Sequence, residues 1–385
     1  MIILDELNYE ALDLNLLLAN IEDYRTSDYG TLFLLRIKEE FLDHFINNKM
    51  YVEIVSHKVD RSDYSPVVIT PDRQFFIRGS DDGKIKVFGL FDGDLVRVFG
   101  DHKGEAVITL AMSRDGNYIA SSSDSIIKLW HYETGTLIHS FKGHNDTVEA
   151  LVFDPNGQVL VSGSDDDEMS ESGIKVWDVR EEKLKATKGS HWRSITSLSF
   201  SSNGDYLVSG ALDKTVNVWN MANGRLINTL VGHKKGVVEV AITDEMRVIS
   251  TSHDDTIKVW NGRTGKVLRE LDFTKLKIKN AQFSVVNSVL SPNQEFIVAG
   301  LQGKPLKGGS KLIMWNFSNG EIIQTLPVSQ WFPGYYEELN QLTISDDGIF
   351  ILSASLDRMI NVWMEFIEYM DFQEIIQKMY NQPKI

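Results

Sequence analysis

Short segments in which apolar and polar side chains alternate recur along most of the chain. In the segment from Ile85 to Phe88, for example, aliphatic side chains flank a lysine, and Val216 to Trp219 repeats the pattern around an asparagine. Alternation with a period of two places one set of side chains on each face of a strand. Turns with glycine and asparagine or aspartate, such as residues 154–157, separate the segments. The pattern predicts an all-β chain with four short strands in every 45 residues or so.

The alternating segments belong to an internal repeat that ends each time in an aromatic residue. Each copy contains a small or hydroxyl residue, a turn with aspartate, and a strand that reads aliphatic, polar, aliphatic. Repeats of this length are typical of arrays whose copies stack to bury a common core. The copies end at Phe88, Trp130, Trp177, Trp219, Trp260, Trp315 and Trp363, which lie 41 to 55 residues apart.

Seven copies in phase resemble the WD40 repeat family, and the resemblance covers residues 51–363. It rests on a Gly-His pair at the start of several repeats, as at His144 and His233, on the aspartate in the turn, and on the final tryptophan. The resemblance implies an all-β fold, a seven-bladed WD40 β-propeller, with each repeat contributing one blade. It also implies a rigid platform that binds proteins or peptides rather than an enzyme.

In this family a histidine, a strand serine, a turn aspartate and the final tryptophan form a hydrogen-bonded tetrad within each blade. In three repeats the serine follows the histidine by 17 or 18 residues and the aspartate follows the serine by four. A buried imidazole needs partners on both ring nitrogens, which the aspartate and serine supply. Because the sets recur in one register, we interpret them as structural rather than as catalytic triads or metal ligands. The sets are His144, Ser162, Asp166 and Trp177; His191, Ser209, Asp213 and Trp219; and His233, Ser250, Asp254 and Trp260.

The other repeats depart from the tetrad pattern. The second repeat has His102, but Ala120 stands where the spacing places the serine. The first repeat has Arg78 and Phe88 in place of the serine and the tryptophan. The sixth repeat lacks both histidine and aspartate, and the seventh lacks a matching histidine. We therefore expect full tetrads in three blades.

Ring closure and the flanking segments complete the predicted organisation. The repeats end at Trp363 after three strands of the last blade, so an open edge remains unless a fourth strand covers it. Residues 51–56 alternate correctly, and we expect them to form this closing strand. Apolar residues three and four apart over 30–47 predict a helix within an N-terminal helical flank, residues 1–50, and a C-terminal helix is expected over 364–385. Two roles stay open for these helices, capping the propeller or docking a partner or a second copy.

Composition and charge narrow the function. The chain has 385 residues, no cysteine and a net charge of −15, which repels phosphate groups, so neither nucleic acid nor an anionic membrane is an expected partner. The apolar runs are far shorter than the roughly 18 residues of a membrane span, and the N-terminus lacks a secretory pattern. The absence of cysteine excludes disulfides, thiolate metal sites and a cysteine nucleophile, and it favours a cytoplasmic location.

Motifs for catalysis are missing from the sequence. It contains no phosphate-binding Gly-x-x-x-x-Gly-Lys loop, no Gly-x-Ser-x-Gly elbow and no His-Glu-x-x-His pair. We therefore predict no enzymatic activity, no cofactor and no metal site. The acidic insertion over residues 165–172 leaves one alternative open, a loop that binds a cation through carboxylates.

Two tryptophans are not needed by the repeat, and both lie in loops that the propeller fold places on one face, its top face. Tryptophan, tyrosine and arginine supply much of the binding energy at protein interfaces. The alternative is that these aromatic residues pack inward over the central channel. The predicted protein-binding residues are Trp192, Arg193, Trp331, Phe332, Tyr335 and Tyr336.

The predicted function is that of a non-enzymatic scaffold or recognition module that binds protein or peptide partners on this top face. One alternative is a substrate receptor or adaptor of a larger complex, such as a ubiquitin ligase, docked through the flanking helices. Another is an enzyme with a site at the mouth of the channel. The loop over 165–172 is acidic and that over 303–310 is basic, which favours a partner of mixed charge.

Overall fold

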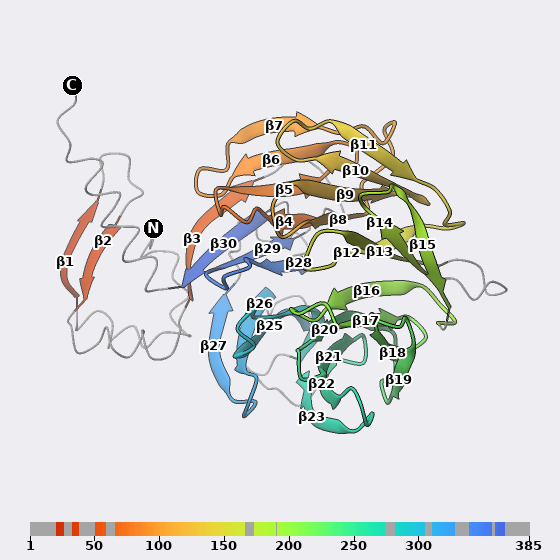
Figure 1. Cartoon of the computed structure of the whole chain (residues 1–385). Helices are drawn as coiled ribbons and strands as arrows, with labels where there is room; N and C mark the ends of the chain where they lie inside the picture. The colour runs from red at the N-terminus through yellow and green to blue at the C-terminus, as the bar shows by residue number, and fades with distance from the viewer. Residues whose placement is uncertain are drawn as a thin grey trace.

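A computed structural model describes ten stretches of the chain. They are residues 21–26, 33–37, 51–58, 66–165, 173–189, 191–273, 282–304, 310–327, 339–355 and 359–365. Seven four-stranded antiparallel sheets are arranged around a ring, and one two-stranded sheet lies outside it (Figure 1). The fold is the predicted seven-bladed β-propeller. Within the described ranges, no helix is long and apolar enough to cross a membrane.

The first four blades follow one another along the chain, each with its strands in sequence order. Blade one consists of β4 (Val67–Ile69), β5 (Phe75–Gly79), β6 (Ile85–Gly89) and β7 (Leu95–Phe99). Blade two consists of β8 (Thr109–Met112), β9 (Tyr118–Ser123), β10 (Ile126–His131) and β11 (Leu137–Phe141). Blade three consists of β12 (Val148–Phe153), β13 (Val159–Ser164), β14 (Ile174–Asp178) and β15 (Lys183–Lys188). Blade four consists of β16 (Ile195–Phe200), β17 (Tyr206–Ala211), β18 (Thr215–Asn220) and β19 (Leu226–Val231).

The remaining blades continue the order, except that the last one takes a strand from the N-terminal side. Blade five consists of β20 (Val237–Ile242), β21 (Arg247–Ser252), β22 (Thr256–Asn261) and β23 (Val267–Asp272). Blade six consists of β24 (Gln282–Leu290), β25 (Phe296–Lys304), β26 (Ser310–Asn316) and β27 (Ile322–Pro327). Blade seven consists of β28 (Leu339–Ile344), β29 (Phe350–Ser355), β30 (Met359–Glu365) and β3 (Tyr51–Lys58).

The ring is closed by strand pairing and by contacts around its inner wall. The first strands of successive blades contact one another in order, and β28 contacts β4 to complete the circle. β3 pairs antiparallel with β30, so residues before the first repeat supply the outer strand of the last blade. The pairing removes the open edge that three strands would leave, because backbone groups of β30 are then bonded on both sides.

One short segment differs from the sequence-based expectation of a helix over residues 30–47. Phe33–Ile37 is a strand, β2, which pairs antiparallel with β1 (Ile21–Thr26). A short apolar run fits a helix or a strand equally well by periodicity, and here the backbone groups bond across to a neighbouring strand. The C-terminal helix predicted over 364–385 cannot begin at 364, because the strand β30 extends to Glu365. The rest of the predicted flanks, residues 1–20, 27–32, 38–50 and 366–385, lies outside the described residues.

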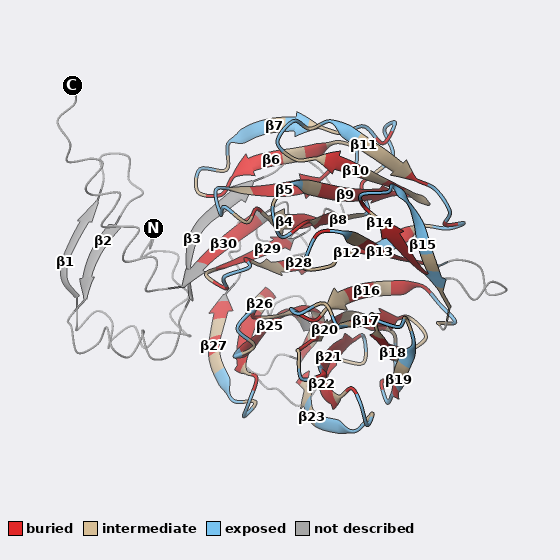
Figure 2. Cartoon of the chain, in the orientation of Figure 1, coloured by how far each residue is buried: buried red, intermediate tan, exposed pale blue. Residues whose placement is uncertain are grey.

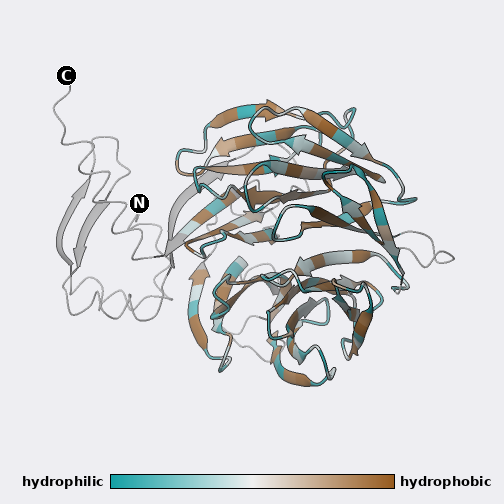
Figure 3. Ribbon diagram, viewed as in Figure 1, coloured by the Kyte–Doolittle hydropathy of each residue, from teal (hydrophilic) through white to brown (hydrophobic). Residues whose placement is uncertain are grey.

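The hydrophobic core lies between the blades. Seven apolar clusters each join two neighbouring sheets, one at every junction of the ring. At the closing junction, Val67 and Phe76 of blade one pack with Leu352 and Val362 of blade seven. The outer strands, such as β7, β15 and β23, carry much of the exposed surface (Figure 2). Apolar and polar positions alternate along many of the coloured blade strands (Figure 3).

Hydrogen bonds on the outer rim also join the blades. His139 Nδ1 on β11 lies 3.1 Å from a carboxylate oxygen of Glu182 in blade three. Lys188 donates to the backbone oxygen of Gly224 in the next blade, at 2.7 Å. The closing junction has an ion pair, since Arg73 of blade one lies 2.8 Å from Asp347 of blade seven.

Near the ring axis, polar side chains bridge the first strands of neighbouring blades. Ser197 Oγ on β16 accepts a hydrogen bond from Val240 N on β20 at 3.1 Å and donates to Glu239 Oε1 at 2.5 Å. At the closing junction, the side-chain oxygen of Gln341 accepts from Val67 N at 2.8 Å in the same way. Burial raises the pKa of Glu239 to about 7, although Ser197 and the Val240 amide favour the ionised form.

We expect E239Q to remove a pH-dependent penalty on stability. A folded-state pKa of about 7, above an unfolded value of about 4.3, means that the contribution of Glu239 is present below about pH 4 and lost as the pH rises through 7. The variant should therefore be more stable than the parent at pH 8, by about 1–3 kcal/mol, and similar to it at pH 4. Urea unfolding at both pH values measures this, with the exposed E133Q as control. An equal difference at both pH values would contradict the assignment.

Candidate functional site

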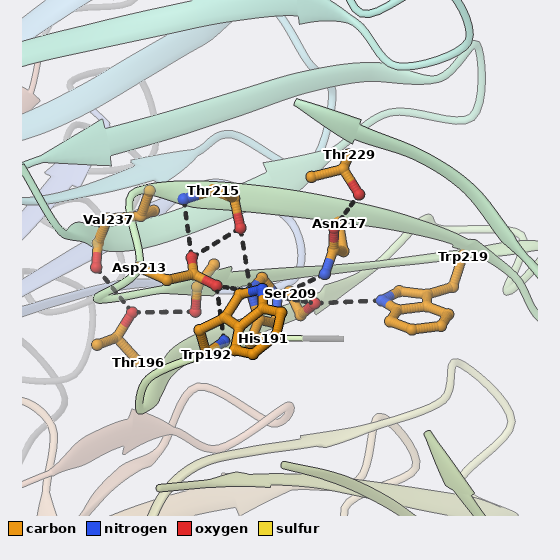
Figure 4. Close-up of polar contacts among 11 residues, drawn as sticks. His191, Trp192, Thr196, Ser209, Asp213, Thr215, Asn217, Trp219, Thr229 and Val237 are labelled. Atoms are coloured by element: carbon orange, nitrogen blue, oxygen red, sulfur yellow. Dashed lines mark hydrogen bonds and ion pairs between the residues drawn. The ribbon is translucent and has the colours of Figure 1, made fainter. Parts of the chain in front are cut away.

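The predicted tetrad of blade four is assembled in the structure. His191 Nδ1 lies 3.0 Å from Asp213 Oδ2, and His191 Nε2 lies 2.8 Å from Ser209 Oγ. Trp219 Nε1 donates to the same serine oxygen at 3.1 Å (Figure 4). An ionised carboxylate only accepts hydrogen bonds, so the proton lies on Nδ1, and Nε2 accepts from the serine hydroxyl.

Blade five repeats this geometry. His233 lies 3.0 Å from Asp254 through Nδ1 and 2.7 Å from Ser250 through Nε2, and Trp260 donates to Ser250 at 2.8 Å. The Asp254 carboxylate also accepts from the backbone N–H of Lys234 at 2.8 Å. The carboxylate therefore fixes both the imidazole and the backbone of the loop that follows it.

Blade three has the same arrangement in its described part. His144 Nε2 lies 2.6 Å from Ser162 Oγ, which also accepts from Trp177 Nε1 at 2.8 Å. Asp166, the predicted fourth member, lies outside the described residues. The predicted histidine, serine and tryptophan are therefore brought together in all three blades.

Blade two also uses a serine, which the sequence analysis missed. Ser121 Oγ lies 2.7 Å from His102 Nε2 and accepts from Trp130 Nε1 at 2.8 Å, whereas the spacing rule points to Ala120. The reason is a shorter turn. Ser123 pairs directly with Ile126, so two residues form the turn where blade four has three. Counting from the tryptophan with a two-residue turn would have found the serine.

The electrostatics favour a structural role for these sets. Burial raises the pKa of Asp213, but hydrogen bonds from His191, Thr215 and the Trp192 N–H outweigh it and hold the pKa at about 2. Burial, with nearby Lys128, lowers the pKa of His102 to about 4, so its ring is neutral. The side chains of His191 and Asp213 are 1% and 7% exposed, so a substrate does not reach them.

Metal binding finds no support among the described residues. No three histidine, aspartate or glutamate side chains in this part of the chain are placed to hold an ion. The acidic insertion, for which cation binding was the alternative, lies outside the described residues over positions 166–172.

Trp192 is the most exposed large hydrophobic residue that the structure describes, at 77%. Its backbone N–H nevertheless donates to Asp213 Oδ2 at 3.0 Å (Figure 4). The buried tetrad therefore holds the loop while the indole stays exposed. Arg193 beside it is also exposed. The other predicted binding residues, Trp331, Phe332, Tyr335 and Tyr336, lie outside the described residues.

Val231, at the end of β19, is the second most exposed apolar residue of blade four after Trp192, and the sequence analysis did not identify it. It is 73% exposed and pairs with Thr215, two residues after Asp213. Aligning the repeats by strand register would have singled it out, because no other blade has a large aliphatic residue there. The corresponding residues are Gly100, Lys142, Gly189, Asp272, Pro327 and Lys58.

We expect S121A to destabilise the protein by about 1–3 kcal/mol, because His102 and Trp130 both lose a buried hydrogen-bond partner. The matched control is S125A, in the turn of the same hairpin, which should change stability by less than about 0.5 kcal/mol. Urea unfolding of the three proteins measures the difference. Equal stability of the two variants would show that Ser121 does not complete the set.

Comparison with known protein families agrees with the division of the chain into propeller blades. A family model described as "WD domain, G-beta repeat" matches residues 93–131, 135–178, 182–220, 224–261 and 326–364, just over half of the chain. Each of the first four matches runs from the region of one blade's fourth strand to the third strand of the next blade.

Several curated proteins share part of the sequence. Apoptotic protease-activating factor 1 of Rattus norvegicus is 35% identical over 91 residues, 23% of this chain and 7% of that protein. Cilia- and flagella-associated protein 52 of Chlamydomonas reinhardtii is 28% identical over 100 residues, 26% of this chain and 16% of that protein. Pre-mRNA-processing factor 19 homolog 2 of Arabidopsis thaliana is 28% identical over 102 residues, 26% of this chain and 19% of that protein. The alignments thus span less than a fifth of each relative, and together with the family match and the seven blades they show that the chain belongs to the WD40 repeat family.

Proposed function

We propose that the chain is a non-enzymatic interaction protein that binds a protein or peptide partner at the top of blade four. WD40 propellers are typically scaffolds for protein interactions, and the proposal concerns which surface serves that role here. We call the surface formed by Trp192, Arg193, Lys214 and Val231 the blade-four surface. The observation that carries the proposal is the exposed indole of Trp192 on a loop fixed by Asp213.

The repeat itself does not require an aromatic residue at this position. The residue after the tetrad histidine is Lys103 in blade two, Asn145 in blade three and Lys234 in blade five. An indole left in water keeps a large apolar area available for burial, at about 25 cal/mol per Å². Tryptophan also loses few torsional degrees of freedom when it is buried, which is why it dominates interface energetics.

The loop is held in place before a partner arrives. Asp213 accepts from the Trp192 N–H, from His191 and from the backbone and side chain of Thr215. Binding to a fixed loop loses less conformational entropy than binding to a mobile one. The tetrad therefore stiffens the blade and also preorganises the binding loop.

Two further predictions remain as proposals. Docking of a larger complex through the flanks depends mostly on residues 1–20, 27–32, 38–50 and 366–385, which lie outside the described residues. A cytoplasmic location is proposed because 385 residues contain no cysteine.

We expect W192A to weaken partner binding by about tenfold or more and to leave the melting temperature unchanged, because the indole is exposed. Affinity purification with mass spectrometry on the full chain, followed by titration of the captured partner, measures the loss. L137A is the matched control, since Leu137 is a half-exposed apolar residue on the outer strand of blade two. Undiminished capture by W192A would refute the proposal, as would a fall in melting temperature that accounts for the loss.

A further inference from the structure

Exposed cations gather around the blade-four surface, and they indicate the chemistry of its ligand. Arg193 and Lys214 belong to blade four, and Lys234 and Lys235 belong to the equivalent loop of blade five. Among the described residues, no carboxylate forms an ion pair with any of these four side chains. Within the described part of the chain these four positive charges are therefore not neutralised by an ion pair, although the net charge of the whole sequence is −15.

Backbone bonds place three loops side by side. Leu212 N donates to Ser194 O at 2.9 Å, which joins the turn that carries Lys214 to the loop that carries Arg193. Leu212 also packs so closely on Gly236 that a Cβ there would come within 2.7 Å of its side chain. Lys235 precedes this glycine, so the cations of blades four and five form one surface.

Backbone conformation fixes the direction of these loops. Lys214 has a φ of 74°, in the left-handed region that non-glycine residues occupy mainly in tight turns. The Lys234 N–H is held by Asp254 at 2.8 Å, as Trp192 is held by Asp213. Lys234 therefore occupies in blade five the position that Trp192 occupies in blade four, so a basic side chain and the indole project from equivalent points on neighbouring blades.

The opposite side of the Trp192 loop is acidic. Glu149, at the start of blade three, is exposed, and the carboxylates of Asp165 and Asp146 lie near it. Ile195, two residues after Arg193, packs on Gly163, which pairs with Ala150 beside Glu149. Glu149 therefore lies next to the Trp192 loop. An acidic ligand is repelled by the carboxylates of blade three and attracted by the lysines of blade five. This uneven charge distribution orients the ligand on the surface.

We propose that the blade-four surface, with Lys234 and Lys235, binds an extended acidic segment of a partner protein. One apolar side chain of the segment contacts Trp192 and Val231, and aspartate or glutamate carboxylates beside it contact the cations of blades four and five. This inference rests on the proposed function and adds the class of ligand to it.

Carboxylates fit this surface better than a phosphate. Three of the four cations are lysines, which act as separate point charges, and the four come from three loops. A phosphate dianion is best bound by donors that converge on one point, above all by bidentate arginines. Separate single charges along an extended chain match separate lysines.

The test uses the full chain and short fluorescent peptides, with fluorescence anisotropy as the readout. The acidic peptides contain glutamate with one tryptophan or leucine placed at different positions, and matched peptides carry glutamine, lysine or one phosphoserine instead. We expect the acidic peptides to bind at least about tenfold more tightly than the glutamine peptides. Raising NaCl from about 50 to about 300 mM should weaken binding, because the paired charges are exposed.

Variants identify the surface. K234E/K235E should weaken binding of the acidic peptides by about tenfold or more, whereas K185E/K266E, which reverses two exposed lysines on other parts of blades three and five, should not. W192A should weaken binding of acidic and glutamine peptides alike. Equal binding of acidic and glutamine peptides would overturn the inference, as would an equal effect of the two double variants.

Other outcomes separate the inference from the proposed function. Tighter binding of the phosphoserine peptide than of every glutamate peptide would overturn the choice of carboxylates. If the natural partner's affinity depends on Trp192 but not on Lys234 and Lys235, the proposed function stands and the acidic ligand is wrong. If it depends on neither, the proposed function fails as well.

Discussion

A buried imidazole with hydrogen bonds on both ring nitrogens joins the loop before the first strand of a blade to the second strand and to the turn that follows it. In blade four, His191 binds Ser209 on β17 and Asp213 in the following turn, and Trp219 on β18 closes the set. Removing one member takes a buried hydrogen-bond partner from its neighbours, so the members of the set stabilise one another. The same carboxylate holds the Trp192 amide, which links the stability of the blade to the position of the exposed indole.

The ring does not depend on this interaction everywhere. Blade one has Phe76 and Phe88 stacked at 5.1 Å between centroids, where other blades end their third strand in tryptophan. The junction between blades seven and one is held by the bond from Val67 N to Gln341 and by the pair of Arg73 with Asp347. Contacts between blades thus keep the ring closed at a junction where the first repeat lacks the tetrad serine and tryptophan.

The architecture and the tetrads follow from periodic features, which a single sequence records well. Strand alternation, the spacing of the final aromatic residues and the offsets from histidine to serine are all local or repeat at fixed intervals. The sequence analysis missed Ser121 because the turn between β9 and β10 is one residue shorter than its equivalent in blade four. Such changes of register are set by turn geometry rather than by composition. The strand β2 was predicted as part of a helix because the periodicity of a short apolar run does not distinguish a strand from a helix.

Some functional features could likewise be predicted from the sequence, and others became apparent only in the structure. Trp192 stood out in the sequence because the repeat does not need it. Val231 became visible only when strand pairing aligned it with Gly100 and Lys142 of other blades. The environment of Glu239 depends on Ser197, 42 residues away on a neighbouring blade, so no local pattern reports its raised pKa.

The most direct test of the account is hydrogen–deuterium exchange on the full chain, with and without its purified partner. The account predicts that the Trp192 amide is protected before binding, because Asp213 accepts from it. It also predicts that the partner slows exchange in the segments around Trp192, Lys214 and Val231, and leaves blade one and blade six unchanged. A freely exchanging Trp192 amide, or protection by the partner confined to other blades, would contradict it.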